Sequence, residues 1–516
     1  MKFSWLCLCL ILVSKSVGAA TLSGYVTDAS NGESLPFANV ALKDTGLGAV
    51  SNSNGYFAIN NVPEGTYSLV VSYIGYQPFE LWVTLTVGEN RRVDAALTLQ
   101  PLATEETVVE ADRFKEERIA QLSFLSLQAT TLSDLPAVGE ADLLRSLQLL
   151  PGIQAASDVS SGLYVRGGGP DQTKILLDQI QLYNPSHAFG FFSTFNPDAI
   201  KDLSLHKGAY PAYYGGNLGA VLDVTNRDGN RNEVQGTGGI SLIAGRMTLE
   251  GPVANGSWMV SGRRTYLEPL LSAIRSESTE IPSYYFYDLN AKVNQNITDY
   301  DKLVISGYFG RDDLNLDLDE GSFITVRWGN TAVTGKWTHI FTPTLFGNFL
   351  VAGSEYVSRT SLSFFDTPIL FQNSIRDITV KGDVDYFASS DHTLTTGFLT
   401  TRYDFSFRQV FNQQDQLSLK LNPYLLSLYG QDQWQALDNT SVRLGLRGNY
   451  FSEQQRFDIE PRLSISHLLT PTIRLKTGAG LYHQYLQLIT TEGFSGGDFW
   501  VPLDSTVTPG SSWQTV

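Results

Sequence analysis

Residues 140–224 decide the fold, from EADLLRSLQLLPG (140–152) to YYGGNLGAVLDV (213–224). The opening segment places apolar residues at helical spacing, and Pro151-Gly152 predicts the end of that helix. The rest of the block predicts a strand that runs into a glycine turn (162–169), a second strand (174–180) and a third strand (203–208). We therefore expect a small domain that mixes one helix with several strands.

The glycine run Gly167-Gly168-Gly169 could in principle cradle a phosphate group. The Gly-Lys-Ser/Thr of a phosphate-binding loop does not follow it, so a tight turn is the favoured interpretation. His187 and His206 have no histidine or carboxylate at ligand spacing along the sequence. They are therefore interpreted as histidines of a loop or of a satisfied core rather than metal ligands, and we expect no cofactor and no metal.

Residues 21–100 predict a small antiparallel β-sandwich. Short β-prone segments alternate there with turn signals such as Asn31-Gly32 and Asn54-Gly55. Residues 101–133 are more polar and show no clear strand period. We expect this second segment to be a linker.

The first twenty residues have the order of a secretory signal. Lys2 is followed by an apolar run over residues 3–13 and by small residues up to Ala20, where we expect cleavage. The run is too short for a spanning helix, which needs about 20 apolar residues. Cys7 and Cys9 are the chain's two cysteines, so the mature protein is expected to hold no disulfide. The formal net charge of −16 argues against nucleic-acid binding.

Residues 229–516 alternate apolar and polar side chains with a period of two. Val442, Leu444 and Leu446, for example, alternate with Arg443, Gly445 and Arg447. A transmembrane barrel strand needs this pattern, with apolar residues toward lipid and polar residues toward the lumen. A soluble β-sandwich also alternates, so the pattern alone leaves both architectures open.

The connections between these strands favour the barrel. Short turns are expected at 298–301, 342–344, 389–391, 437–439 and 470–472, and longer polar loops near 312–322, 359–374 and 409–416. Short turns on one side and long loops on the other are typical of outer-membrane barrels. Residues 313–319 alternate Asp with Leu, which could suit calcium. Because no Gly directly follows Asp317 and no Glu ends the segment, the outer end of a strand is the favoured interpretation.

In this order, residues 134–228 resemble the plug of TonB-dependent outer-membrane receptors. The matching motifs are the helix before Pro151-Gly152, the Val165-Arg166-Gly167 turn, the Leu177-Asp178 strand end, Pro197-Asp198-Ala199-Ile200, and Tyr214-Gly215-Gly216 with Gly219-Ala220-Val221. The plug residues singled out by this resemblance are Arg166, Gly167, Gly168, Gly169, Asp178, Gly215, Gly216 and Gly219. Residues 184–192 resemble the Bacteroidetes type of these receptors. Residues 21–100 resemble the carboxypeptidase regulatory-like domain, on motifs such as Gly24-Tyr25-Val26-Thr27-Asp28 and Asn54-Gly55-Tyr56-Phe57.

The resemblance implies a mainly β protein, with an N-terminal β-sandwich, a small α+β plug and a partial antiparallel transmembrane β-barrel. It implies import of a scarce ligand, siderophore-type or another nutrient, across the outer membrane with inner-membrane proton-motive force. The implied partners are the periplasmic TonB transducer, outer-membrane lipid and a ligand of unknown identity. The segment that resembles a TonB box, which would add a strand to TonB, is Glu106, Thr107, Val108, Val109, Glu110 and Ala111. A plain linker strand is the alternative for this hexamer.

The predicted barrel portion departs from the family. It holds about a dozen strands, against about twenty-two in plugged outer-membrane transporters, and residues 511–516 lack the usual terminal aromatic. We therefore expect this sequence to be a piece of a longer receptor. A surface adhesin or structural β-protein without transport stays an alternative. An enzyme is not expected, because we find no zinc-binding His/Glu motif, no Gly-x-Ser-x-Gly elbow and no catalytic cysteine.

Overall fold

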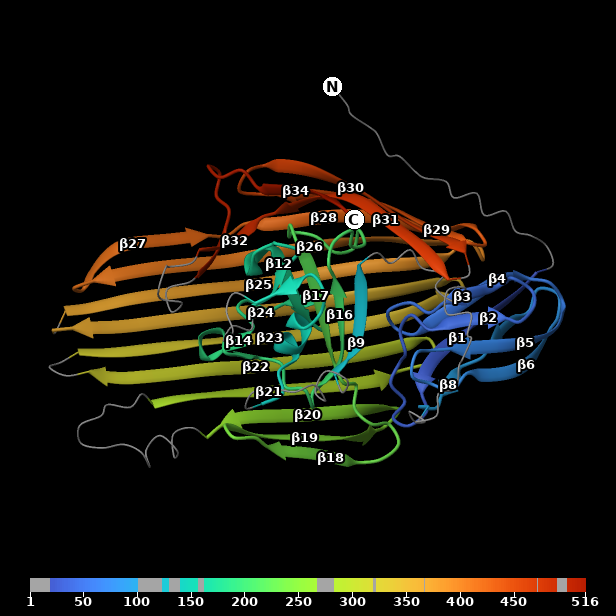
Figure 1. The fold of residues 1–516 in the computed structure, drawn as a ribbon, viewed down its shortest axis with the longest axis horizontal. Helices are drawn as coiled ribbons and strands as arrows, with labels where there is room; N and C mark the ends of the chain where they lie inside the picture. The colour runs from blue at the N-terminus through green and yellow to red at the C-terminus, as the bar shows by residue number, and fades with distance from the viewer. Residues whose placement is uncertain are drawn as a thin grey trace, which may run out of the picture.

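The computed structural model describes residues 19–100, 123–129, 140–155, 162–266, 283–318, 322–365, 367–470, 472–489 and 499–516. The expected signal up to residue 18 and the TonB-box-like hexamer (106–111) therefore lie outside the described residues. The chain forms three bodies: an N-terminal domain, a plug (123–228) and a large curved sheet, the barrel wall (235–515) (Figure 1). Within the described ranges, no helix has the length and apolar character needed to cross a membrane.

The N-terminal domain is the expected β-sandwich. Its strands are β1 (Ala20–Asp28), β2 (Asn39–Leu42), β3 (Gly48–Val50), β4 (Tyr56–Val62), β5 (Gly65–Ser72), β6 (Phe79–Leu85), β7 (Asn90–Arg92) and β8 (Ala95–Leu97). They form two four-stranded sheets, one ordered β4-β1-β7 with β8 also on β1, the other β3-β2-β5-β6. Fully buried side chains such as Val26, Val40 and Phe57 fill the space between the sheets.

The plug is a small α+β domain built on a five-stranded mixed sheet. Its elements are β9 (Phe124–Gln128), α2 (Leu143–Gln148), β10 (Ile153–Gln154), β11 (Tyr164–Val165), the 3-10 turn η1 (Pro170–Gln172), β12 (Thr173–Leu177), β13 (Ile180–Gln181), β14 (Ser186–His187), the 3-10 turn η2 (Ala188–Gly190), β15 (Phe192–Ser193), β16 (Ile200–His206) and β17 (Ala220–Asn226). The main sheet is ordered β13-β12-β17-β16-β9, with β12 and β17 parallel. Asp142 caps the expected helix α2 by accepting the backbone N–H of Arg145 at 3.0 Å.

Two expectations for this region need correction. Residues 124–128 were expected in the linker but form β9, which pairs with β16, so the plug begins before residue 134. A single strand was expected over 174–180. The chain instead reverses at Asp178-Gln179, which both have positive φ, so that Leu177 pairs with Ile180 in a hairpin. Positive φ at both central residues is the geometry of a tight hairpin turn.

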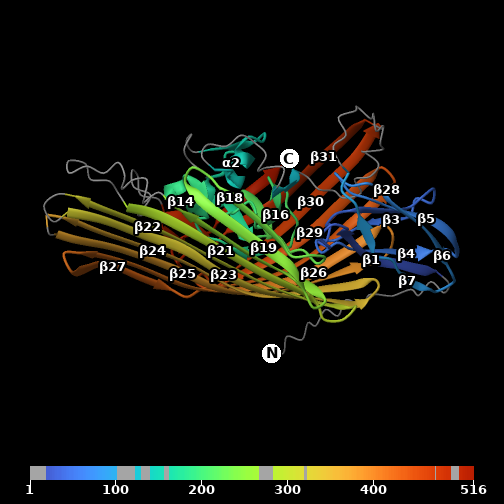
Figure 2. The same cartoon turned by 90° about the horizontal axis from the view of Figure 1, so that it is seen from below.

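The barrel wall is a 15-stranded antiparallel sheet. Its strands are β18 (Gln235–Ile240), β19 (Ala244–Val253), β20 (Gly256–Thr265), β21 (Ser283–Asn296), β22 (Asp301–Leu318), β23 (Ser322–Thr342), β24 (Leu345–Phe364), β25 (Thr367–Phe387), β26 (His392–Phe411), β27 (Gln414–Leu421), β28 (Tyr424–Leu437), β29 (Thr440–Phe451), β30 (Arg456–Thr470), β31 (Ile473–Gln484) and β34 (Gly510–Thr515). A separate hairpin joins β32 (Leu486–Ile489) and β33 (Phe499–Pro502). Seen from below, the sheet curves around the plug (Figure 2).

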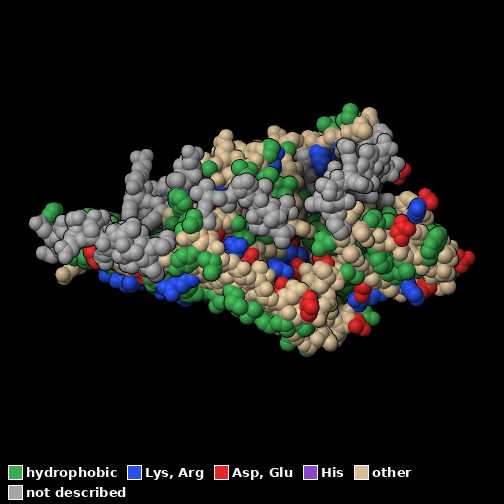
Figure 3. Space-filling view, turned by 60° about the horizontal axis from the view of Figure 1, so that its bottom comes forward, with side chains coloured by type: hydrophobic (Ala, Val, Ile, Leu, Met, Phe, Trp, Pro, Cys, Tyr) green, Lys and Arg blue, Asp and Glu red, His purple; other side chains and the backbone are tan. Residues whose placement is uncertain are grey.

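The period-two pattern sorts side chains between the two faces as expected. Leu444 and Leu446 are exposed on the outer face, whereas Arg443 and Arg447 are buried on the inner face. Figure 3 shows hydrophobic side chains spread over the outside of the sheet, and acidic and basic side chains on the N-terminal domain and in the hollow beside it. This sidedness is what a wall between lipid and a filled lumen requires.

The short turns are confirmed, but the long loops are not where we expected them. The strands β22 to β27 run through most of the stretches 312–322, 359–374 and 409–416, with Leu318 paired with Ser322 and Phe364 paired with Thr367. At Asn412-Gln413 both residues have positive φ, which closes a two-residue turn between β26 and β27. The polar sequence there marks the solvated ends of long strands. Asp313 lies within β22 and pairs with Arg327 at 2.7 Å, as the strand interpretation of 313–319 implies.

Candidate functional site: the plug against the barrel wall

The Arg166–Gly169 motif is a tight turn inside the plug. Arg166 and Gly167 have positive φ, and the N–H of Gly168 donates to the carbonyl of Val165 at 3.0 Å. The Arg166 guanidinium donates to Ser123 Oγ at 2.6 Å, which ties the turn to the start of β9. The structure therefore places these glycines in a turn that shapes the plug.

Asp178 joins the plug to the wall. Its carboxylate accepts the N–H of Asn226 at 3.2 Å and the side-chain amide of Asn226 at 2.7 Å. Lys292 of β21 lies with its Nζ 3.3 Å from Asp178 and 2.8 Å from Asp228, and it donates to the Asn226 carbonyl. Because this ammonium is buried, its charge is balanced by plug carboxylates rather than by water.

Gly215, Gly216 and Gly219 belong to a second contact, between the 210–219 segment and two arginines of the wall. A Cβ at Gly215 would lie 2.5 Å from Nε of Arg447, and one at Gly219 would lie 2.9 Å from the Gln172 carbonyl. Gly216 has φ +82, a conformation that glycine adopts without strain. These glycines therefore allow the segment to approach both the guanidinium and its own neighbouring backbone.

The two arginines hold backbone carbonyls of the plug. Arg447 donates to the Ala212 carbonyl at 3.1 Å. Arg462 donates to the carbonyls of Tyr210 at 3.2 Å, Pro211 at 2.5 Å and Tyr214 at 2.8 Å, and it pairs with Glu460 at 2.6 Å. The alternating pattern of residues 442–447 and 462–466 predicted that both arginines point to the inner face of the sheet. It did not identify the plug carbonyls that they bind.

His187 forms a third contact, which sequence spacing did not reveal. Its Nδ1 lies 2.6 Å from Asp312 and its Nε2 lies 2.9 Å from Asp288, two carboxylates of the wall. Arg263 also pairs with Asp288, at 2.6 Å, and the ring of Phe286 stacks on the imidazole at 4.1 Å. Burial opposes protonation, but the two carboxylates outweigh it and raise the pKa of His187 to about 9. His187 is thus a satisfied core histidine, held by charges from the wall.

His206 is also a core histidine. Its ring packs against Phe124 at 4.8 Å and Tyr214 at 5.3 Å between centroids. Burial, followed by the charge of Arg443, lowers the pKa of His206 to about 3, so this imidazole is neutral. Within the described part of the chain, no group of three or more His, Cys, Asp or Glu side chains is arranged to hold a metal ion.

A cavity of about 280 Å³ lies where the plug, the wall and the N-terminal domain meet. Its lining is strongly charged, with lysines and acids from the plug and the wall. The plug contributes Lys201 and Asp223, among others, and burial raises the pKa of Asp223 to about 6. The plug's apolar core, in contrast, continues directly onto wall residues such as Tyr308 and Leu350. The plug therefore touches the wall both through packed apolar surface and across polar space.

Two family models match the chain. Residues 22–109 match the CarboxypepD_reg-like domain, and residues 123–221 match the TonB-dependent Receptor Plug Domain. The chain thus contains both domains that its sequence resembles. The first match extends to residue 109 and so overlaps the hexamer 106–111. A comparison with curated protein sequences gave no match.

Several solved outer-membrane receptors share the fold. The siderophore receptor PirA from Pseudomonas aeruginosa aligns with a TM-score of 0.56 at 15% identity, over 76% of this chain and 70% of that chain. A variant of the ferric enterobactin receptor PfeA from Pseudomonas aeruginosa aligns at 0.56 and 16% identity, over 77% and 69%. The outer membrane transporter YddB from Escherichia coli aligns at 0.56 and 12% identity, over 70% and 61%. These likenesses show that the plug and the long antiparallel sheet share the fold of these plugged outer-membrane barrels.

Proposed function

We propose that this chain belongs to a TonB-dependent receptor of the outer membrane that imports a scarce nutrient. The observation that carries the proposal is the plug seated against the polar inner face of a sheet whose outer face exposes apolar side chains. A domain that fills a lumen and is held by contacts that can break and re-form suits gated passage. An adhesin or a structural β-protein would not need a domain that fills the lumen of a barrel.

The coupling segment in this proposal is the hexamer 106–111, which would pair with TonB by strand addition. The first described element after it is β9, an edge strand that pairs only with β16 in the plug sheet. Force applied through the linker would therefore reach β9 first. Peeling an edge strand breaks its hydrogen bonds one after another, which requires less force than shearing them together.

Deletion of Thr107 to Ala111 in the full-length receptor tests the proposal. Growth of a receptor-deletion strain under iron limitation and on defined glycans first identifies a nutrient whose uptake depends on the receptor. In that condition the shortened receptor should lose uptake and keep ligand binding at the cell surface. Deletion of the equally long segment from Lys115 to Ile119 is the matched control and should leave uptake intact. Uptake that survives loss of 107–111 would show that the hexamer has no coupling role.

A further inference from the structure

The turn that joins β3 to β4 in the N-terminal domain reaches the inner surface of the barrel wall. The side-chain amide of Asn54 donates a hydrogen bond to Asn348 at 2.9 Å, and its carbonyl oxygen accepts one from Nζ of Lys336 at 2.9 Å. Asn52 donates to the carboxylate of Asp385 at 3.2 Å. Asn54 is buried by these contacts, so the domain is docked on the wall through polar groups that have lost their water.

An aromatic contact stands next to this turn. The ring of Tyr56 stacks on Phe346 with centroids 5.0 Å apart, and its hydroxyl donates to the carbonyl of Pro343 at 2.8 Å. Phe387 packs against the same tyrosine, and Asn60 donates to the Phe387 carbonyl. Tyr56 belongs to an apolar cluster shared with the wall rather than to the core of the sandwich. Tyr56 therefore joins the N-terminal domain to the wall through packed aromatic surface.

The same domain holds the plug. Lys201 of β16 donates to the carbonyl of Ser34 at 2.6 Å, and Glu33 accepts the N–H of Asp228 at 2.6 Å. Phe37 packs edge-to-face on Phe124 of β9. The N-terminal domain therefore bridges the plug and the wall, the two bodies that must separate for a passage to open.

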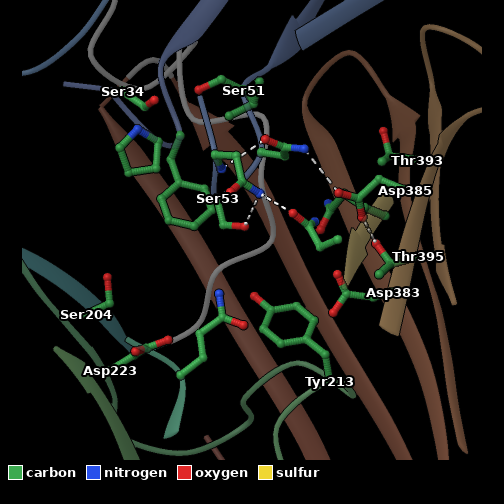
Figure 4. Close-up of a pocket in the computed structure, with 18 of the residues that line it drawn as sticks. Ser34, Ser51, Ser53, Ser204, Tyr213, Asp223, Asp383, Asp385, Thr393 and Thr395 are labelled. Atoms are coloured by element: carbon green, nitrogen blue, oxygen red, sulfur yellow. Dashed lines mark hydrogen bonds between the residues drawn. The ribbon is translucent and has the colours of Figure 1, made fainter. Parts of the chain in front are cut away.

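The docked turn also forms one side of the charged cavity. Figure 4 shows Ser34, Ser51 and Ser53 of the N-terminal domain facing Asp223 and Tyr213 of the plug across the cavity, with Asp383 and Asp385 of the wall beside them. The wall turns at this end are the short ones, at 342–344 and 387–392. In the proposed receptor this end faces the periplasm, because outer-membrane barrels place their short turns there.

We propose that the N-terminal domain is a second closure of the receptor, which seals the polar space between plug and wall from the periplasm while it is docked. The inference rests on the proposed function for the direction of passage. Undocking of the 51–55 turn would then be a separate step from movement of the plug.

Thiol accessibility tests this closure without ligand or TonB, so its result is independent of whether import is found. Ser306 of β22 lines the cavity and is buried, and its hydroxyl hydrogen-bonds to that of Thr334, so Ser306→Cys serves as the reporter. Cys7 and Cys9 are replaced by alanine. The purified full-length receptor is treated with the anionic reagent 2-sulfonatoethyl methanethiosulfonate, and the rate of modification is measured.

Two variants break the docking from opposite sides. Asn52→Ala/Asn54→Ala/Tyr56→Ala removes three side chains of the domain that contact the wall, and Phe346→Ala/Asn348→Ala removes two of their wall partners with the domain sequence unchanged. The control Thr66→Ala/Trp82→Ala/Thr84→Ala alters exposed positions on β5 and β6 of the same domain. Heat-modifiable gel mobility confirms that each barrel is folded.

We expect both docking variants to raise the modification rate at least tenfold over the docked receptor, and the control to leave it unchanged (order-of-magnitude expectation for exposing a buried thiol). Rates within about twofold of the docked receptor in both folded docking variants would overturn the proposal, because the domain would then not limit access to the cavity.

Discussion

Nε2 of His187 in the plug lies 2.9 Å from a carboxylate oxygen of Asp288 in the barrel wall, although 101 positions separate the two residues. Both side chains are buried, and Asp312 holds the other ring nitrogen. An imidazolium between two carboxylates of β21 and β22 gives the plug a charged anchor on the inner face of the wall. Contacts of this kind resist displacement until the charges are neutralised or water enters.

The anchor predicts a pH dependence of plug docking. The pKa of His187 is raised from about 6.5 in the unfolded chain to about 9. Its contribution to stability is therefore fully present below pH 6.5 and is lost as the pH rises through about 9. The midpoint of plug unfolding in urea should fall across this window in the native protein. In His187→Gln, whose side chain can still hydrogen-bond but has no charge to lose, the midpoint should fall less. Equal pH profiles for the two proteins would contradict the assignment.

Gly215→Ala should displace the plug from Arg447. The added Cβ would lie 2.5 Å from Nε, and Arg447 is buried and fixed by bonds to Ala212 and Asn449. Overpacking of this kind costs about 1–3 kcal/mol. Gly430→Ala is the matched control, because a Cβ there meets nothing within 4 Å. Urea denaturation of the two variants measures the difference, and equal midpoints would argue against a close contact at Gly215.

Arg462→Ala should release the 210–214 segment. It removes donors from three plug carbonyls and takes a partner from the buried Glu460 carboxylate. Breaking a buried pair in this way costs about 3–5 kcal/mol. We expect faster proteolysis within 210–214 in the folded receptor, with partial protection in Arg462→Lys, whose single ammonium cannot reach all three carbonyls.

The comparison for Arg462 is Arg408→Ala, which breaks an ion pair with Asp415 in which both side chains are half exposed. Such a pair contributes only about 0–1 kcal/mol. A proteolysis rate for Arg462→Ala no higher than that of Arg408→Ala would mean that the arginine does not hold the plug.

Leu446→Arg tests whether the outer face meets lipid. Leu446 is exposed near the middle of β29, so an arginine there would face acyl chains at a cost of about 2–4 kcal/mol. Leu437 is equally outward but lies at the end of β28, where Leu437→Arg should cost about 0–1 kcal/mol. Guanidinium-induced unfolding of each variant in lipid vesicles measures both free-energy costs. A similar, small cost at both positions would place this face in water.

The long connections show where reasoning from local sequence was incomplete. Polar runs such as 359–374 predicted loops, but the backbone continues in register as β24 and β25, with Phe364 opposite Thr367. Beyond the apolar band of a barrel, a strand can be polar on both faces without losing its hydrogen bonds. Composition therefore cannot separate a loop from a solvated hairpin there.

The sequence by itself determined the order of the three bodies, the helix before Pro151, the short turns of the wall and the side of the sheet on which Arg447 lies. These features follow from turn chemistry and residue period, which act over a few positions. Only the tertiary structure decided which partners meet across the lumen, such as His187 with Asp288 or Asn54 with Asn348. Those contacts depend on the curvature and register of the whole sheet and on where each domain packs. The spacing of neighbouring residues in the sequence determines none of these.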